Sequence, residues 1–180
     1  MHEWDQFFYS EVSHGAFSTL ECRAILEMAE ALPEHRSVLH RHTGEQIRDS
    51  GIRWLYAEQG AGWVFDRINA RVDEYNAKYW YDIQPIRSGQ LTRYGVGQEY
   101  RNHVDIGAGP MSRRKISVSI ELTDPESYEG GGLEVGGDRV ELRRGDMALF
   151  SSMMLHRALP VTSGERWSLV CWILGEAPLR

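Results

Sequence analysis

Two histidines and one aspartate stand out in this chain because together they can bind a metal ion. His103 and Asp105 are separated by one residue, and His156 follows much later. Two imidazoles and one carboxylate can hold Fe(II) on one side and leave the opposite coordination positions open for chemistry. The residue types therefore predict an oxidative metal centre, with His103, Asp105 and His156 as metal ligands and catalytic residues.

The spacing of these residues indicates how a β structure would position them. Residues two apart in a strand project to the same face, so His103 and Asp105 can point into one interior while Val104 packs on the other side. His156 would come from a later strand. A His-x-Asp pattern is common by chance, and a histidine is more often a hydrogen-bonded core or surface residue than a ligand, so further features have to support the site.

Arg166 is the first of those features. It begins a predicted strand in which alternation places Arg166, Ser168, Val170 and Trp172 on one face. A buried guanidinium needs an anionic partner, because an uncompensated charge in the interior costs several kcal/mol. A dicarboxylate cosubstrate would provide one through a bidentate contact. An ion pair with an Asp or Glu of this chain is the alternative.

Composition limits the kind of protein that could carry such a site. With 180 residues, 42% of them hydrophobic, we expect a single domain over residues 1–180. The net charge of −6 gives no reason to bind nucleic acid or an anionic membrane. Met1–Tyr9 lacks the pattern of a secretory signal, so a cytoplasmic protein is expected. Cys22 and Cys171 are expected to be buried, reduced thiols.

Two helices are predicted in the first half of the chain. The first spans Ser18 to Leu32, with Ser18 placed as N-cap and Glu21 three residues later, which completes a capping box. The second runs from about Trp63 to Trp80, where apolar residues recur at intervals of three and four. Pro85 then marks the end of this helical flanking region, residues 1–84.

After Pro85 the pattern changes to short alternating runs separated by glycine, proline and acidic turns. The predicted strands are 89–94, 100–104, 116–122, 132–135, 139–142, 147–150, 156–160 and 167–173. So many short strands favour a sandwich or barrel over a parallel sheet with crossover helices. The predicted fold class is α+β, mainly β: a jelly-roll core over residues 85–175 with N-terminal flanking helices.

From about Leu91 to Gly175 the chain resembles the Fe(II)- and 2-oxoglutarate-dependent oxygenases of the prolyl-4-hydroxylase type, especially the short bacterial PKHD-type hydroxylases. The order and spacing of several motifs carry the resemblance. They are Leu91–Tyr94, Asn102–Asp105, Ile116–Ile120, Leu122–Pro125, Tyr128–Leu133, Gly145–Phe150, Leu155–Arg157, Pro160–Val161, Gly164–Arg166 and Trp172–Ile173.

This resemblance implies a double-stranded β-helix, cupin-like in architecture, and assigns roles to individual residues. His103, Asp105 and His156 would bind Fe(II). Arg166 would bind the distal carboxylate of 2-oxoglutarate, with Tyr94 and Ser168 adding hydrogen bonds. Dioxygen would be the second cosubstrate, and ascorbate is a candidate reductant.

The reaction implied is hydroxylation of an unactivated C–H bond with release of succinate and CO2. Related halogenases have a small residue in place of the carboxylate ligand, so Asp105 favours hydroxylation over halogenation. Desaturation or ring formation begins with the same hydrogen abstraction and stays open.

Three functions remain in view. The first is an oxygenase acting on a small molecule such as an amino acid or a natural-product intermediate. The second is a prolyl or other peptidyl hydroxylase acting on a protein, and the third is a non-catalytic, cupin-like metal- or ligand-binding sensor. The sequence leaves the oligomeric state open.

The first half of the chain contains candidate substrate contacts, which we interpret as parts of loops. Arg48, Ser50, Arg53 and Trp54 precede the second predicted helix and are expected to form a solvated loop with one packing tryptophan. His40–His42 is expected to be a surface loop and not a second metal site. The PKHD-type relatives extend beyond the barrel, whereas this sequence ends at Arg180, so the oligomer contacts that such an extension could provide are left open.

Overall fold

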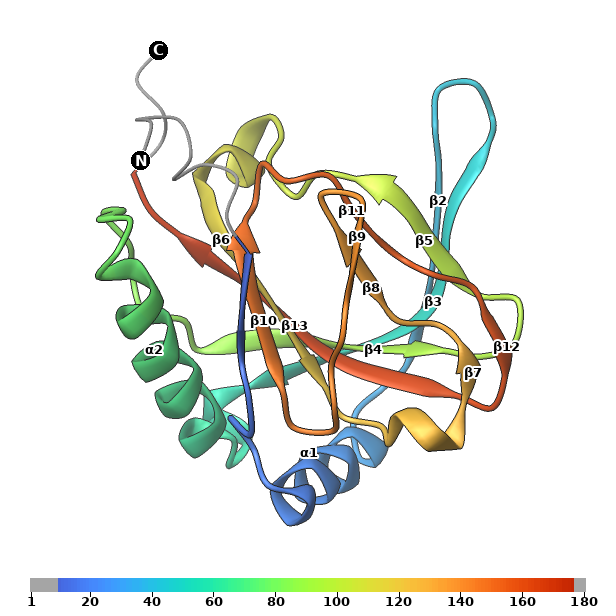
Figure 1. The fold of residues 1–180 in the computed structure, drawn as a ribbon, viewed down its shortest axis with the longest axis horizontal. Helices are drawn as coiled ribbons and strands as arrows, with labels where there is room; N and C mark the ends of the chain where they lie inside the picture. Colours follow the sequence, from blue (N-terminus) through green and yellow to red (C-terminus); the bar gives the residue numbers. More distant parts are fainter. Residues whose placement is uncertain (1–9, 177–180) are drawn as a thin grey trace.

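The computed structural model describes residues 10–176, in which two helices pack against one strongly curved antiparallel sheet (Figure 1). Helix α1 (Thr19–Glu30) begins at the predicted capping box, where the Ser18 and Glu21 side chains accept hydrogen bonds from each other's backbone N–H groups. This local hydrogen bonding fixes the start of the helix independently of the rest of the fold. The predicted signal-free start, Met1–Tyr9, lies outside the described residues.

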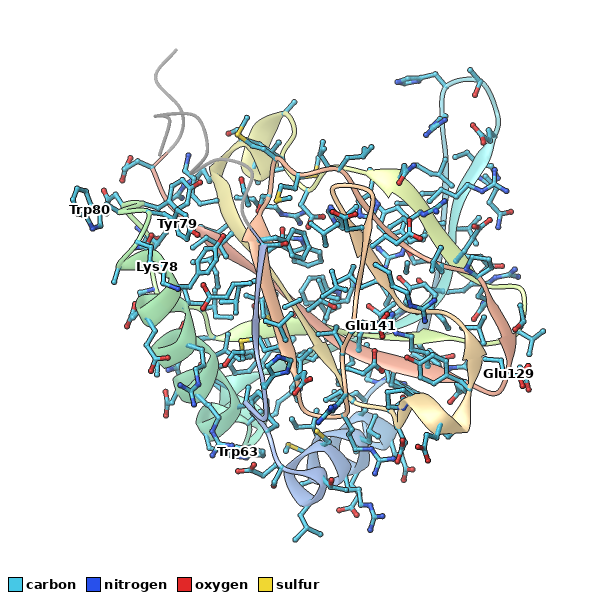
Figure 2. All side chains as sticks on the ribbon, viewed as in Figure 1. Trp63, Lys78, Tyr79, Trp80, Glu129 and Glu141 are labelled. Atoms are coloured by element: carbon cyan, nitrogen blue, oxygen red, sulfur yellow. The ribbon has the colours of Figure 1, made fainter. Side chains whose placement is uncertain are left out.

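Helix α2 (Gly62–Asn76) ends four residues before the predicted boundary at Trp80. The Asn76 side chain causes this earlier end, because its amide bonds both the backbone N–H and the carbonyl of Tyr81 and closes a turn. Trp80 adopts a φ of 55° within that turn and is 86% exposed. Figure 2 shows its side chain projecting away from the sheet beyond the end of α2.

The strands after Pro85 are β4 (Ser88–Tyr94), β5 (Glu99–His103), β6 (Arg114–Glu121), β7 (Glu129–Gly130), β8 (Leu133–Val135), β9 (Asp138–Val140), β10 (Met147–Ser151), β11 (His156–Ala158), β12 (Val161–Ser163) and β13 (Arg166–Leu174). Eight of them correspond to predicted strands, and two short ones, β7 and β12, were not predicted. The strand predicted over 156–160 ends at Ala158, two residues before Pro160, which has no N–H for a ladder.

Three strands lie in the part of the chain that was predicted to be a helical flank. They are β1 (Ser10–Ser13), β2 (His35–His40) and β3 (Gln46–Tyr56). The main sheet has the order β1-β10-β6-β13-β4-β3-β5-β11-β8-β9, with β2 pairing with β3, and β7 and β12 form a separate pair. The first half of the chain therefore completes the sheet as well as covering it.

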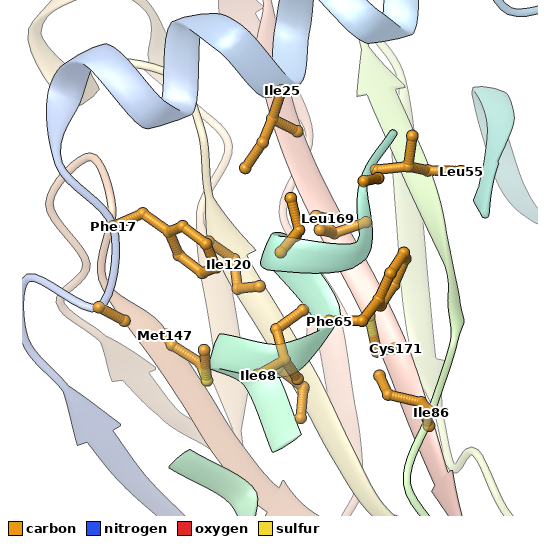
Figure 3. Close-up of a cluster of buried hydrophobic side chains, with 14 of the residues drawn as sticks. Phe17, Ile25, Leu55, Phe65, Ile68, Ile86, Ile120, Met147, Leu169 and Cys171 are labelled. Atoms are coloured by element: carbon orange, nitrogen blue, oxygen red, sulfur yellow. The ribbon is translucent and has the colours of Figure 1, made fainter. Parts of the chain in front are cut away.

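The sheet curves until its two halves face each other, which is the double-stranded β-helix arrangement. Leu133 and Val135 of β8 pack against Ala148 and Phe150 of β10 across the interior. The two helices cover the outer face, where Ile25 of α1 and Phe65 and Ile68 of α2 pack against β6 and β13 (Figure 3). The predicted fold class is confirmed.

Strand β13 shows the predicted alternation most clearly. Leu169, Cys171 and Ile173 are fully buried in the apolar core beneath the helices. Arg166, Ser168, Val170 and Trp172 line the cavity on the other face. Both Cys22 and Cys171 are buried free thiols, as predicted, and burial raises the pKa of Cys22 to about 11. None of the helices in residues 10–176 combines the length and apolar character needed to cross a bilayer.

Candidate metal centre

The pairing of two short strands brings the three predicted ligands together inside the barrel. His103 ends β5 and His156 begins β11, and the two are partners in the antiparallel register. Asp105 follows β5, and its backbone N–H donates a hydrogen bond to the carbonyl of Ser152, which directly follows β10. Asp105 Oδ2 lies 3.3 Å from His156 Nε2, and Asp105 Oδ1 lies 3.8 Å from His103 Nε2. One ligand atom from each residue lies within 4.8 Å of the others, which is a spacing that can hold a metal ion.

Hydrogen bonds to the backbone orient both imidazoles. Nδ1 of His103 lies 2.8 Å from the carbonyl oxygen of Arg101, and Nδ1 of His156 lies 2.9 Å from that of Met154. A carbonyl can only accept, so each Nδ1 carries the proton and each Nε2 is left with a free lone pair facing Asp105. This is the tautomer that metal-binding histidines adopt when an outer partner fixes the ring.

The carboxylate of Asp105 is held in its ionised form. Burial alone would raise its pKa, but the close contact with His156 and a 2.6 Å hydrogen bond donated by the Ser117 hydroxyl hold the pKa well below the usual range. For His103, burial and the neighbouring His156 lower the pKa to about 4, although Asp105 opposes this. A negative carboxylate and a neutral His103 imidazole are the protonation states that a metal ion requires of its ligands.

At the far end of the cavity, Arg166 is only 2% exposed. Its Nε donates a 2.8 Å hydrogen bond to Glu121, so the intrachain ion pair that the sequence left as an alternative does form. Burial alone would lower the pKa of Arg166, but Glu121 holds it raised, and the guanidinium stays charged. Its Nη2 is buried without a hydrogen-bond partner among the described residues. An unpaired buried N–H donor costs free energy, which a bound acceptor would recover.

Tyr94 and Ser168 lie beside Arg166, as the strand register requires. Tyr94 is the partner of Arg166 across β4 and β13, and Ser168 lies two residues further along β13. Both side chains are buried and line the cavity that contains the three ligand residues. Burial raises the pKa of Tyr94, so its hydroxyl remains a hydrogen-bond donor at neutral pH.

A small, partly open cavity joins the ligand residues to Arg166. One end presents two imidazoles and a carboxylate, and the other presents the unpaired Nη2 of Arg166 with the Tyr94 hydroxyl. A divalent metal ion fits the first donor set, and a carboxylate fits the second. The residues present therefore suit Fe(II) and 2-oxoglutarate at these two ends.

Several residues of the site were not predicted from the sequence. Ser117 bonds Asp105, Glu121 pairs with Arg166, and Tyr100 stacks on His103 with ring centroids 3.5 Å apart. A signal for the first two was present in the sequence: Ser117, Ser119 and Glu121 recur at every second position of an otherwise apolar strand. Polar residues on one face of such a strand indicate a hydrophilic interior.

The interpretation of Arg48, Ser50, Arg53 and Trp54 as parts of a solvated loop was wrong. All four belong to strand β3, where Arg48 and Ser50 pair with β2, and Arg53 and Trp54 pair with β4. Arg48 is buried and lines the cavity, whereas Arg53 points to the other face and bonds Glu34. His40 ends β2, and the exposed turn that follows contains His42.

A double-stranded β-helix with two histidines and an aspartate facing a buried arginine defines a class of metal-dependent oxygenases. Residues 89–174 match the model of the 2OG-Fe(II) oxygenase superfamily. The matched segment contains Tyr94, the three ligand residues, Arg166 and Ser168.

Curated relatives of the chain are PKHD-type hydroxylases. The one from Methylobacterium nodulans is 43% identical over 92 residues, which cover 46% of this chain and 40% of that protein. The one from Klebsiella pneumoniae is 40% identical over 128 residues, covering 66% of this chain and 55% of that protein. The matched segment thus spans about half of these relatives or less.

Solved structures show the same fold at lower sequence identity. A prolyl-4-hydroxylase from Pseudomonas putida is 21% identical, with a TM-score of 0.74 and 93% of each chain covered. An oxidoreductase of the 2OG-Fe(II) oxygenase family from Burkholderia pseudomallei is 19% identical, with a TM-score of 0.70 over 93% of this chain and 86% of that chain. These structures cover the N-terminal strands and helices as well as the barrel.

Proposed function

We propose that this protein is an Fe(II)- and 2-oxoglutarate-dependent dioxygenase that hydroxylates an unactivated C–H bond and releases succinate and CO2. The single observation that carries the proposal is the pairing, within one cavity, of three ligand residues with a buried arginine that has an unpaired donor. A binding module of the cupin type would need the metal ligands but not the second, carboxylate-binding end.

His103, Asp105 and His156 are proposed to hold Fe(II), with Ser117 and the two backbone carbonyls fixing their orientation. Arg166, Tyr94 and Ser168 are proposed to bind the distal carboxylate of 2-oxoglutarate. When bound, iron and 2-oxoglutarate supply the oxidising chemistry with dioxygen. The protein positions the substrate C–H bond and excludes water from the enclosed end of the cavity.

The substrate is proposed to be a small molecule such as an amino acid or a natural-product intermediate. The cavity supports this, because the space between its lining side chains is small and also has to accommodate the cosubstrate. One observation favours a peptide as a second candidate. A larger, open cleft, lined by Trp54, Met111 and Arg114 among others, adjoins the cavity at Trp172.

The remaining sequence predictions are kept as proposals. Residues 1–180 are proposed to form one oxygenase domain that is located in the cytoplasm. It is proposed to bind a small molecule or peptide, and to bind neither nucleic acid nor a membrane.

The experiment that tests the function is succinate release from 2-oxoglutarate under air, with and without Fe(II). Free amino acids, proline-containing peptides and small metabolites would be screened as stimulators, with mass detection of one added oxygen. Stimulation by free amino acids supports the small-molecule substrate, and stimulation by peptides alone supports the second candidate. A protein that binds Fe(II) but never turns over 2-oxoglutarate would be a sensor.

A further inference from the structure

Arg48 is a second buried arginine in the cavity, and its charge has no counter-ion. The residue is 7% exposed and lines the same space as the ligand residues and Arg166. Its Nε donates a 2.9 Å hydrogen bond to the Ser50 hydroxyl. Within residues 10–176, its two terminal nitrogens have no hydrogen-bond partner, and the side chain forms no ion pair.

The surroundings of Arg48 compensate its charge only in part. The guanidinium carbon lies 4.8 Å from the centre of the Tyr100 ring, and such a cation–π contact contributes about 0.5–2 kcal/mol. A buried charge without a partner costs several kcal/mol. The neighbouring arginines differ in this respect, because Arg166 is paired with Glu121 and Arg36 with Asp49. An anion bound in the cavity would remove the imbalance.

Arg48 pairs with Tyr100 on β5 and packs over its ring, and that ring stacks on His103. Arg48 therefore lies beside the ligand residues, and its field also reaches Tyr94, the partner of Arg166. Tyr94 lies in the electrostatic field of both arginines, each of which opposes the rise in its pKa that burial causes. Two guanidinium groups therefore face one region, and Glu121 neutralises only one of them.

We propose that Arg48 is a second carboxylate-binding residue of this cavity and acts with Arg166 on the dicarboxylate cosubstrate. This inference rests on the proposed function. 2-Oxoglutarate has two negative charges, and Arg166 already shares its charge with Glu121, so Arg48 supplies a full positive charge from strand β3. Ser50 holds the Nε of Arg48 and thereby directs the terminal nitrogens toward the ligand.

The test measures binding and not turnover. Wild-type protein and the Arg48→Gln variant are loaded with Mn(II), and 2-oxoglutarate is titrated by calorimetry. Loss of a charge-assisted hydrogen bond predicts a decrease in affinity of roughly 10-fold to 100-fold. Arg36→Gln is the matched control, because it removes the same charge from the adjacent strand on a side chain 71% exposed to solvent, and its affinity should equal that of the wild type.

A second ligand shows which carboxylate Arg48 contacts. Pyruvate has the 2-oxo acid group but no distal carboxylate. If Arg48→Gln weakens 2-oxoglutarate and leaves pyruvate unchanged, Arg48 binds the distal carboxylate; if both weaken equally, it binds the carboxylate next to the oxo group. Both results support a carboxylate-binding role, and unchanged affinity for both ligands would overturn it.

Two further measurements distinguish a binding role of Arg48 from damage to the fold or to the metal site. Arg48→Lys keeps the charge but not the planar donor group, so it should recover part of the affinity. Mn(II) affinity and the thermal unfolding midpoint of both variants report whether the site and the fold are intact. If wild-type protein with Mn(II) binds no 2-oxoglutarate, the proposed function itself fails; if it binds and Arg48→Gln binds equally well, only the role of Arg48 fails.

Discussion

The two faces of strand β13 differ in almost every physical property, although their residues alternate along the same nine-residue segment. On one face Leu169, Cys171 and Ile173 are completely buried against the helices, where apolar packing stabilises the fold. On the other face Arg166 and Ser168 are buried among polar groups that have free donors. Burial on the first face raises the free energy of unfolding. Burial on the second face lowers it, because polar groups there are kept away from water without partners.

This difference predicts that substitutions on the two faces affect different measurements. Changes on the helix face should alter the free energy of unfolding and leave cosubstrate affinity unchanged. Changes on the cavity face should alter metal or cosubstrate binding. Arg166 is the exception that sharpens the comparison, because it belongs to the cavity face and also forms a buried ion pair with Glu121.

The largest effect on activity is expected when a metal ligand is substituted. His103→Ala should lower 2-oxoglutarate turnover by more than about 100-fold, because even the outer partners of metal ligands typically contribute 10- to 100-fold. Bound iron, measured by elemental analysis, should fall with it. His40→Ala removes an exposed histidine and should behave as the wild type. Full iron content and activity in His103→Ala would exclude this residue as a ligand.

Arg166 should show effects on both stability and binding. Arg166→Ala leaves Glu121 as an unpaired buried charge, which costs about 3–5 kcal/mol of unfolding free energy. The double variant Arg166→Met, Glu121→Leu removes both charges and should restore most of the stability in urea unfolding.

The double variant also isolates the binding role of Arg166. 2-Oxoglutarate affinity for the Mn(II) protein should remain lost in it, because no donor replaces Nη2. If affinity returns together with stability, Arg166 serves the fold and not the cosubstrate.

Much of this architecture could be predicted from the sequence, for identifiable reasons. The capping box at Ser18 and the alternation of β13 are local patterns whose physical cause acts within a few residues. Strand β3 was not predicted, because Arg48, Asp49, Ser50 and Arg53 give it no apolar alternation. Its order comes from pairing with β2, β4 and β5, which is a property of the folded sheet.

The same limit applies to the site. The three ligand residues could be found from their types and spacing, and Ser117 had a detectable signal. Arg48 was named only as a candidate substrate contact in a loop and Tyr100 was not named, because their place in the cavity depends on a register between two strands that are far apart in sequence. Side chains that meet across a sheet can be paired only once the neighbouring strands are known.

A matched pair on β13 tests the comparison directly. Leu169→Ala should lower the free energy of unfolding by about 2–5 kcal/mol, because it removes a fully buried side chain from a packed core. Ser168→Ala, one residue away on the cavity face, should change it by less than about 1 kcal/mol and weaken 2-oxoglutarate binding several-fold. Equal effects of the two variants on stability and on binding would contradict the division between the faces.

The smallest expected effect is a pH dependence of the unfolding free energy that originates at His103, another residue that lines the cavity. The pKa of His103 is about 4 in the folded, metal-free protein and about 6.5 in an unfolded chain. Between these values the unfolded chain binds a proton that the folded protein does not, so the stability contributed by a neutral His103 is present above about pH 6.5 and is lost as the pH falls. Asp105 stays ionised over this range because its pKa is held well below it.

The slope from His103 is at most about 1.4 kcal/mol per pH unit. Urea unfolding of metal-free protein at pH 7 and pH 5 measures it, and His103→Gln is the control because its amide does not titrate. The variant should lose less stability between these pH values than the wild type does. An equal loss in both proteins would mean that the pH dependence of stability arises elsewhere in the molecule. His103 would then not contribute to it.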